Sequence, residues 1–329
     1  MITAFTRGIA TCALLGASLL AAPAQATNGY FANGYGGQSK GMAGAGVAVP
    51  TGVLGMAQNP ATGVKVGNSA GFCLTTFAPN RDVRIQPGGP LTPGTYSSHN
   101  DVFVIPCGGA NWALDDRSSL GLFVFANGGM NTEFDTNFFA GLGAGSSPVG
   151  VNLEQAFITV NYARQVSDRL TLGISPILAV QRFKAQGLQA FSGLSVAPND
   201  VTNRGHDWST GFGLNLGLLF EASPEWTLGA AYRNKIQMSE FSRYKGLFAD
   251  GGEFDIPAML TLGAAYTPAP PPTGPSPPSI SASISVPSMP SPIPAPRRAA
   301  HWVAQTASAS AGRMSMSGGS PRSGANPIN

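Results

Sequence analysis

The feature that most constrains the fold of this chain is a twelve-residue stretch, Thr210 to Glu221, in which apolar residues alternate with small or polar ones. Because successive side chains of a strand point to opposite faces, a period of two predicts a strand with one apolar face. Strands of soluble domains are mostly about five or six residues long, whereas about nine to eleven tilted residues cross a bilayer. The stretch therefore predicts a membrane-crossing strand.

The same alternation recurs from residue 69 to residue 267, with no convincing helical period. Three turn signatures, Asp115-Asp116-Arg117, Ser167-Asp168-Arg169 and Ser223-Pro224-Glu225, each precede a Leu-Gly pair that opens the next strand. Short turns alternating with long loops are typical of membrane barrels. The predicted fold class is therefore all-β, an antiparallel transmembrane β-barrel, with eight strands at 69–79, 100–112, 118–127, 151–164, 169–184, 207–221, 225–240 and 256–267. Six aromatic residues fit its interfacial girdles: Tyr162, Trp208, Phe220, Trp226, Tyr232 and Tyr266.

Composition supports this class and excludes a nucleic-acid partner. Only 11% of the residues are charged and 43 are Gly, as in a barrel with an apolar outside and small polar groups inside. The net charge of +3 comes from five arginines at the two ends of the chain, Arg7 and four beyond residue 296. Without them 19 − 5 = 14 basic residues face 16 acidic ones, so the body is near neutral.

Residues 1–26 have the features of a secretory signal peptide. Arg7 is followed by the apolar segment 9–22 and by the cleavage signal Ala24-Gln25-Ala26. An exported chain can form disulfides, so Cys73 and Cys107 are either bridged or two buried thiols. No metal-ligand pattern or cofactor fingerprint is present, so we expect neither a metal nor a cofactor.

Residues 27–68 are glycine-rich, and Ala, Ser and Thr fill most of the remaining positions, which suits a segment folded tightly in a confined space. In order they contain Asn33-Gly34, Lys40-Gly41 with Gly44, and Asn59-Pro60-Ala61. This order resembles the N-terminal hatch of the FadL/TodX family of outer-membrane transporters. The resemblance continues to residue 267, through Asn127-Gly128-Gly129, Tyr162-Ala163-Arg164 and Pro257-Ala258-Met259.

The resemblance implies a barrel plugged by residues 27–68, in the outer membrane of a Gram-negative bacterium. It also implies passive uptake of long-chain fatty acids or other hydrophobic compounds, which displace the hatch and leave sideways through a gap made by a kinked strand. Gly71 or Gly108-Gly109 can provide that kink. The ligand would be a long-chain fatty acid or an aromatic or aliphatic hydrocarbon. The other expected partners are membrane lipid, lipopolysaccharide and the barrel-assembly machinery, with the protein itself a monomer.

Four cations are candidates for holding a fatty-acid carboxylate. Arg182 and Lys184 share one strand face, and Arg233 and Lys235 repeat the arrangement. The alternative is that these side chains are rim charges facing water or lipopolysaccharide.

At Pro268 the composition changes. Residues 268–296 contain twelve prolines, and residues 268–329 contain no Phe, Tyr, Asp or Glu. Proline cannot donate to a β-ladder, so we expect no further strands, a partial barrel over 69–267 and a disordered tail over 268–329. By resemblance the family barrel has about fourteen strands. We interpret the tail as a translation of the wrong reading frame; the alternative is a real proline-rich extension.

Catalysis is not expected. An outer-membrane lipase needs a serine and a histidine, but His99 and His206 lie in loop-like segments, and the adjacent Ser98 and His99 would point to opposite faces of a strand. The other readings are a structural or adhesive barrel without transport activity and a non-functional truncated family member.

Overall fold

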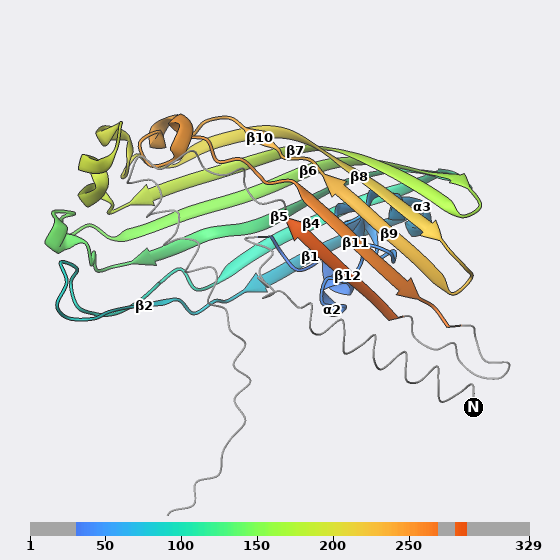
Figure 1. Ribbon diagram of the computed structural model, residues 1–329, viewed down its shortest axis with the longest axis horizontal. Helices are drawn as coiled ribbons and strands as arrows, with labels where there is room; N and C mark the ends of the chain where they lie inside the picture. The colour runs from blue at the N-terminus through green and yellow to red at the C-terminus, as the bar shows by residue number, and fades with distance from the viewer. Residues whose placement is uncertain (1–30, 269–279, 288–329) are drawn as a thin grey trace, which may run out of the picture.

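The computed structural model describes residues 31–268 and 280–287, and most of their strands form one long antiparallel sheet curved into a trough (Figure 1). The predicted signal peptide at 1–26 lies outside this range. The order of the main strands is β1-β4-β5-β6-β7-β8-β9-β11-β12. Their bounds are β1 Ser69–Phe77, β4 Phe103–Asp115, β5 Ser118–Phe134, β6 Val149–Ser167, β7 Leu170–Gln186, β8 Asp207–Glu221, β9 Trp226–Arg233, β11 Met259–Tyr266 and β12 Ile280–Pro287.

Each of the eight predicted strand regions contains a strand, and two small additions were not predicted. Gln237–Met238 forms the short strand β10, which pairs with β8, so the predicted strand 225–240 is interrupted after Arg233. A separate hairpin joins β2 (Asp82–Ile85) and β3 (Gly94–Ser97). These strands are short and lie next to glycine and proline, which hid their alternation.

The predicted turns close one end of the sheet, at the right of Figure 1. The Asp115 carboxylate accepts hydrogen bonds from the Arg117 backbone N–H and the Ser118 hydroxyl, both at 2.7 Å. Ser223 Oγ accepts the N–H groups of Glu225 and Trp226 at 3.2 and 3.1 Å. The opposite end carries the longer loops and the 3₁₀ helices Ala140–Leu142, Gln189–Leu194, Pro198–Asp200, Ser242–Tyr244 and Ala249–Gly251.

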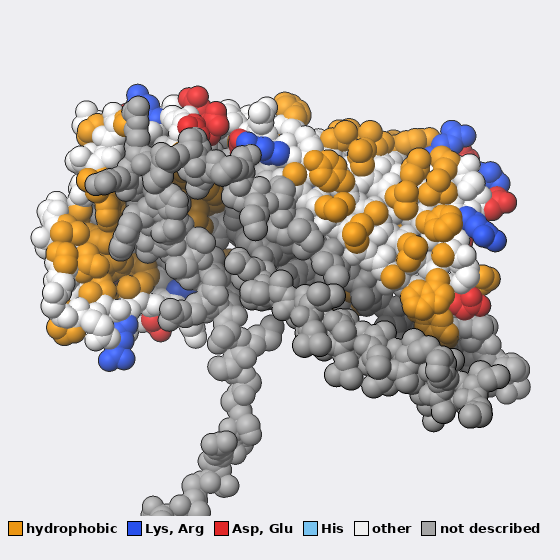
Figure 2. Space-filling view, in the orientation of Figure 1, with side chains coloured by type: hydrophobic (Ala, Val, Ile, Leu, Met, Phe, Trp, Pro, Cys, Tyr) orange, Lys and Arg blue, Asp and Glu red, His pale blue; other side chains and the backbone are white. Residues whose placement is uncertain are grey.

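The outer face of the sheet is apolar over the part near the short turns, where Figure 2 shows a field of hydrophobic side chains bordered by charged ones. Its exposed residues include Leu172, Ile174, Leu216, Leu228 and Leu262, and five of the six predicted girdle aromatics are also exposed, with Tyr266 half-buried. Apolar area of this extent is unfavourable in water and suits lipid. None of the helices in the described ranges is long and apolar enough to span a membrane.

The inner face of the sheet holds residues 31–68, the predicted hatch. This segment contains α2 (Gly36–Gly41), the 3₁₀ helices Val53–Ala57 and Pro60–Thr62, and α3 (Gly63–Val66), all lying within the trough (Figure 1). Met56 and Leu54 from the hatch pack with Phe123, Phe125 and Phe157 from β5 and β6. The core of the molecule is therefore shared between the hatch and the wall.

The expectation that no strand follows Pro268 is wrong. Ile280–Pro287 forms β12 and pairs with all of β11, from Tyr266 opposite Ile280 to Met259 opposite Pro287. The physical reason is local: no proline lies between Ser279 and Val286, and Ile, Ala and Val alternate there with Ser. The remaining residues of the expected tail, 269–279 and 288–329, lie outside the described residues.

Within the described residues the sheet does not close on itself. β1 pairs only with β4, and β12 only with β11, so these two strands are its ends. The architecture is an incomplete barrel with the hatch on its inner side.

Candidate functional site: the hatch seat and the gap in the wall

Asn59 joins the hatch to the wall. Its carboxamide Nδ2 donates to the carbonyl of Val47 at 2.7 Å and to the carbonyl of Leu218 in β8 at 3.0 Å. Its Oδ1 accepts the N–H of Ala61 at 3.0 Å, which caps the 3₁₀ helix that begins at Pro60. Asn59 is completely buried, so all of these bonds are made away from water. The Asn-Pro-Ala segment is thus a joint between plug and barrel.

Two wall glycines make room for this segment. A side chain on Gly173 of β7 would collide with the backbone of Pro60 and Ala61, and one on Gly217 of β8 would collide with Asn59 and Pro60. Gly173 and Gly217 lie directly opposite each other. Gly173 belongs to one of the Leu-Gly pairs that follow the turn signatures, so the repeat has a structural role: it opens a seat for the hatch.

Three wall asparagines also hold the hatch, and each donates to hatch carbonyls through Nδ2. Asn111 of β4 reaches Gly63 and Gly67 at 3.0 and 2.8 Å. Asn161 of β6 reaches Pro60 at 3.3 Å, and Asn215 of β8 reaches Ala57 at 3.2 Å. Sequence reasoning missed these residues, although inward asparagines within an otherwise apolar or small-residue strand were the available signal. We call Asn111, Asn161 and Asn215 the seat asparagines.

The other predicted hatch residues shape its first turn. Gly34 and Gly44 both have positive φ, and Gly34 lies so close to Gly44 that a side chain there would be 3.1 Å from its Cα. The Lys40 ammonium donates to Thr75 Oγ1 in β1 at 2.6 Å. Asn33 leads into this turn, whereas Gly41 has open space around it.

The wall opens between β4 and β5. These strands pair from Gly108 to Asp115 only, while the remaining part of β4, Phe103 to Cys107, pairs with β1 alone. β5 also shifts register against β6 between Gly128 and Asn131. Of the two predicted kink positions, Gly108-Gly109 is where the strands part, whereas Gly71 lies in a regular ladder opposite Gly109.

A cavity of about 410 Å³ lies at this gap. Phe103, Ile105 and Leu153 line it with side chains from the inner face, whereas Val104 and Pro106 belong to the outer face. Because both faces contribute to one cavity, it connects the interior with the outer surface at the level of the wall. Its lining is mostly apolar, which suits a hydrophobic ligand.

Cys73 and Cys107 lie directly opposite each other in β1 and β4, with their Cα atoms 5.0 Å apart, and form a disulfide. They are partly buried against the apolar cluster of the hatch and wall. The bond joins the two strands that form one border of the gap.

The four cations predicted to hold a carboxylate do not lie together in the structure. Arg233 points inward, is 7% exposed, and lies over the ring of Phe31 at 4.3 Å. Lys235 follows the end of β9 and pairs at the surface with Asp255 at 2.7 Å. Arg182 and Lys184 lie on the outer face of β7, where Arg182 pairs with Glu154 at 2.6 Å. The structure therefore brings only Arg233 of the four into the interior, and the expected Arg233–Lys235 pairing on one face is wrong because the strand ends between them.

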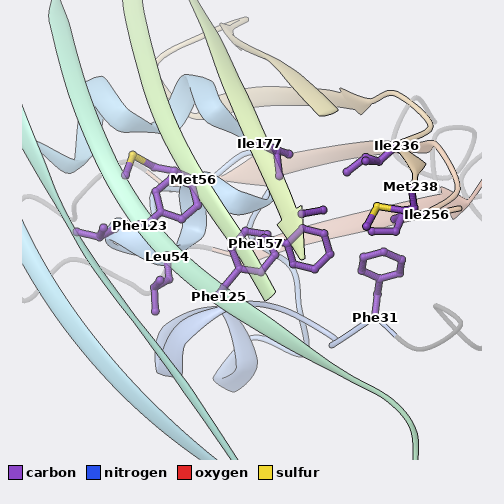
Figure 3. Packing of buried hydrophobic residues seen from close by; sticks show 12 residues of the cluster. Phe31, Leu54, Met56, Phe123, Phe125, Phe157, Ile177, Ile236, Met238 and Ile256 are labelled. Atoms are coloured by element: carbon purple, nitrogen blue, oxygen red, sulfur yellow. The ribbon is translucent and has the colours of Figure 1, made fainter. Parts of the chain in front are cut away.

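Phe31, the ring beside Arg233, belongs to an apolar cluster that also contains Phe125 and Phe157 (Figure 3). The rings of Tyr35 and Phe125 are 4.6 Å apart, and those of Phe125 and Phe157 are 4.8 Å apart and stacked. Burial raises the pKa of the Tyr35 phenol, and the charge of Arg233 opposes that shift. A single buried cation beside apolar rings is an arrangement that suits an acid with a hydrocarbon tail.

The described part of the chain has no group of three or more His, Cys, Asp or Glu side chains placed to hold a metal ion. His99 Nε2 is 3.0 Å from Asp135 Oδ2, and both side chains are mostly exposed. The Ser98 hydroxyl accepts the backbone N–H of Glu133.

Comparisons with known proteins agree with this architecture. A long-chain fatty acid transport protein of Escherichia coli O6:H1 is 27% identical over 149 residues, which cover 40% of this chain and 33% of that relative. The alignment thus spans about a third of the length of the curated relative.

Two solved structures share the fold. The toluene transporter TbuX of Ralstonia pickettii has 21% identity and a TM-score of 0.51, over 71% of this chain and 68% of its own. The toluene transporter TodX of Pseudomonas putida has 22% identity and a TM-score of 0.52, over 73% and 68%.

The family profile described as outer membrane protein transport protein (OMPP1/FadL/TodX) matches residues 17–284. The match continues past Pro268 into β12, in agreement with the strand found there. The family resides in the outer membrane of Gram-negative bacteria, and so does this protein. With its hatch, its antiparallel wall and this match, the chain belongs to the OMPP1/FadL/TodX family of outer membrane transport proteins.

Proposed function

We propose that this protein mediates passive uptake of long-chain fatty acids or other hydrophobic compounds, which leave the barrel sideways between β4 and β5. The observation that carries the proposal is the cavity lined from both faces of the sheet where β4 separates from β5. A sideways exit lets an apolar ligand pass into lipid without crossing water.

The proposed path begins at the end of the barrel with the long loops. There Phe134, Phe138, Leu153, Phe183 and Tyr244 form a buried apolar cluster above the hatch. A fatty acid would place its tail among these rings and those around Phe125 and Phe157, and its carboxylate near Arg233. Movement of the hatch from its seat would then free the way to the gap.

The proposed partners follow from the surface. The apolar outer face would contact membrane lipid, and the charged residues on the side of the long loops would contact lipopolysaccharide. Insertion would use the barrel-assembly machinery, and the protein would act as a monomer. We propose no catalytic activity, because the matched family is one of transport proteins, and His99 and Asp135 lie exposed at the surface in two separate loops.

The proposal is tested by filling the gap. Ala126 lines the cavity from β5, so Ala126→Trp would obstruct it. Ala230→Trp is the matched control, because Ala230 is a half-buried alanine of the outer face on β9, away from the cavity lining. Both genes are expressed in a strain lacking its own fatty-acid transporter, and uptake of labelled oleate is measured.

We expect Ala126→Trp to reduce uptake to the level of the strain without the gene, while Ala230→Trp retains wild-type uptake. Full uptake by Ala126→Trp would contradict exit through this gap. No uptake by the wild-type protein, with oleate or with several hydrocarbons, would contradict transport itself.

That last outcome would favour a second candidate, a family member without transport activity that has a structural or adhesive role. The observation in its favour is that β1 and β12 each lack a second neighbour within residues 31–268 and 280–287. Lipid cannot satisfy the backbone groups of an open edge.

A further inference from the structure

Three buried amide side chains form a row across the inner wall, and we call Asn127, Gln155 and Gln181 the amide row. Asn127 of β5 lies directly opposite Gln155 of β6, and Gln155 lies directly opposite Gln181 of β7. All three are at least 97% buried. Since neighbouring strands are about 4.8 Å apart, the row extends over roughly 10 Å.

The row lies between two apolar layers. On the side toward the hatch the next inward residues are Phe125, Phe157 and Ala179, which belong to the cluster that includes the hatch. On the other side are Leu153 and Phe183, which belong to the cluster near the long loops. Burying a polar row between two apolar layers lowers the stability of the protein unless the amides form hydrogen bonds.

Most of the polar atoms of the row lack a hydrogen-bond partner. The side chain of Gln155 has none on either Nε2 or Oε1, and Asn127 Nδ2 and Gln181 Oε1 also have none. The Gln181 Nε2 donates to the carbonyl of Phe254 at 3.1 Å, and Asn127 Oδ1 accepts from the Tyr35 hydroxyl at 3.5 Å. Asn127 and Gln155 both line the cavity at the gap.

From this arrangement we propose that the amide row binds the oxygen-bearing head group of the transported compound. The unpartnered amide N–H groups of Asn127 and Gln155 can donate to the oxygens of a fatty-acid carboxylate, which accepts hydrogen bonds. A bare hydrocarbon of the same length would leave the amides unpartnered, so the row selects against it. The inference rests on the proposed function and narrows its ligands to amphiphiles, such as fatty acids, over aromatic or aliphatic hydrocarbons.

The test varies the head group and the row together. Oleic acid, methyl oleate and 1-octadecene share one chain length and differ in what they offer to an amide. Affinities are measured by competition with a fluorescent fatty acid on the purified full-length protein in phospholipid nanodiscs, and uptake is measured in cells. The variants are Gln155→Leu and Asn127→Leu, and the matched control is Thr159→Val. Thr159 also faces inward from β6, is 1% exposed and has an unpartnered hydroxyl, but it lies outside the row and the cavity lining.

We expect the wild-type protein to prefer oleic acid to 1-octadecene. Gln155→Leu should weaken oleic acid binding roughly tenfold, as expected for the loss of one or two hydrogen bonds, and leave 1-octadecene binding unchanged or tighter. Methyl oleate, whose neutral ester oxygens are weaker acceptors than a carboxylate, should lie between the two. Thr159→Val should match the wild-type protein.

If the wild-type protein binds oleic acid and 1-octadecene with equal affinity, the inference is overturned, but the proposed transport function is not. The same follows if Gln155→Leu and Asn127→Leu keep the wild-type ratio, or if Thr159→Val changes it as much. Selective binding that depends on Gln155, without any uptake in cells, would instead contradict transport and leave the row as a binding site.

Discussion

The seat asparagines and the amide row are two sets of buried amides on the inner face of one wall, and they differ in how they are satisfied. Asn111, Asn161 and Asn215 each donate to hatch carbonyls. Gln155, on the same strand as Asn161 and six residues away, has no partner on either polar atom. The seat asparagines hold the hatch, whereas the amide row touches the hatch only where Asn127 accepts from Tyr35 and keeps most of its polar atoms for a bound molecule. Buried amides that bond to hatch carbonyls are therefore structural, and we assign the buried amides without such bonds to ligand binding.

The largest effect is expected from a side chain that fills the space in the wall where the hatch is seated. Gly173→Val places a side chain where the backbone of Pro60 and Ala61 lies, so the hatch cannot seat as it does in the wild-type protein. We expect trypsin to cleave after Lys65 faster in Gly173→Val than in the wild-type protein. Gly71→Val is the control, because no atom of another residue lies within 4 Å of the position of its new Cβ. Equal cleavage of both variants would mean that the seat does not hold the hatch.

The seat asparagines and the amide row can be compared directly by replacing one amide of each with leucine. Asn161→Leu removes the Nδ2 donor to the Pro60 carbonyl and leaves the Ser175 hydroxyl, which donates to Asn161 at 2.7 Å, without that acceptor. It should lower the free energy of unfolding by about 1–3 kcal/mol. Gln155→Leu deletes atoms that have no partner, so its stability should be unchanged or raised.

The measurement for this pair is the temperature at which the folded electrophoretic form is lost. If Gln155→Leu destabilises the protein as much as Asn161→Leu does, the two sets are not different and the amide row is a structural feature.

An effect of similar size, but on ligand binding and not on stability, is expected at Arg233. Arg233→Gln removes the cation beside Phe31 and should weaken oleic acid binding by about 1.5–3 kcal/mol, the range for hydrogen bonds to charged groups, without changing 1-octadecene binding. Arg182→Gln, on the outer face, should leave both ligands unaffected. If the two variants are indistinguishable in the competition assay, the head group is held by the amide row alone.

The smallest effect is expected for the surface ion pair between the hatch and the wall. Lys65 Nζ is 2.6 Å from Glu221 Oε1, and both side chains are about 40% exposed. Pairs of this kind contribute about 0–1 kcal/mol and weaken with salt. Lys65→Gln should therefore change the unfolding temperature far less than Asn161→Leu. If Lys65→Gln lowers the unfolding temperature more than Asn161→Leu does, the hatch is held mainly by this ion pair and not by the seat asparagines.

Alternation predicted most of the wall because the side-chain period of a strand is local. It identified all eight strand regions and the turns after Asp115 and Ser223. It did not identify β12, because the surrounding prolines dominated the composition of this segment, although the strand's own only proline is its last residue, Pro287.

The site could be predicted only in part. Asn59 was found through its motif, but the face on which Arg182 and Arg233 lie depends on the phase of each strand relative to the core. Arg182 alternates with Gln181 and Phe183, which are buried, so it must point outward. The amide row is a matter of register between three strands, and register is set by turns and loops that one sequence does not specify in advance.

The Cys73–Cys107 disulfide has a consequence for the order of events during biogenesis. It closes a segment with a sequence separation of 34, and both cysteines lie in the first two strands of the wall to leave the inner membrane. Oxidation in the periplasm can therefore fix the β1–β4 register before the later strands arrive. Such a chain would reach the assembly machinery with β1 and β4, which border the gap, already paired in their final register. The later strands would then be added to a pair that the disulfide holds in place.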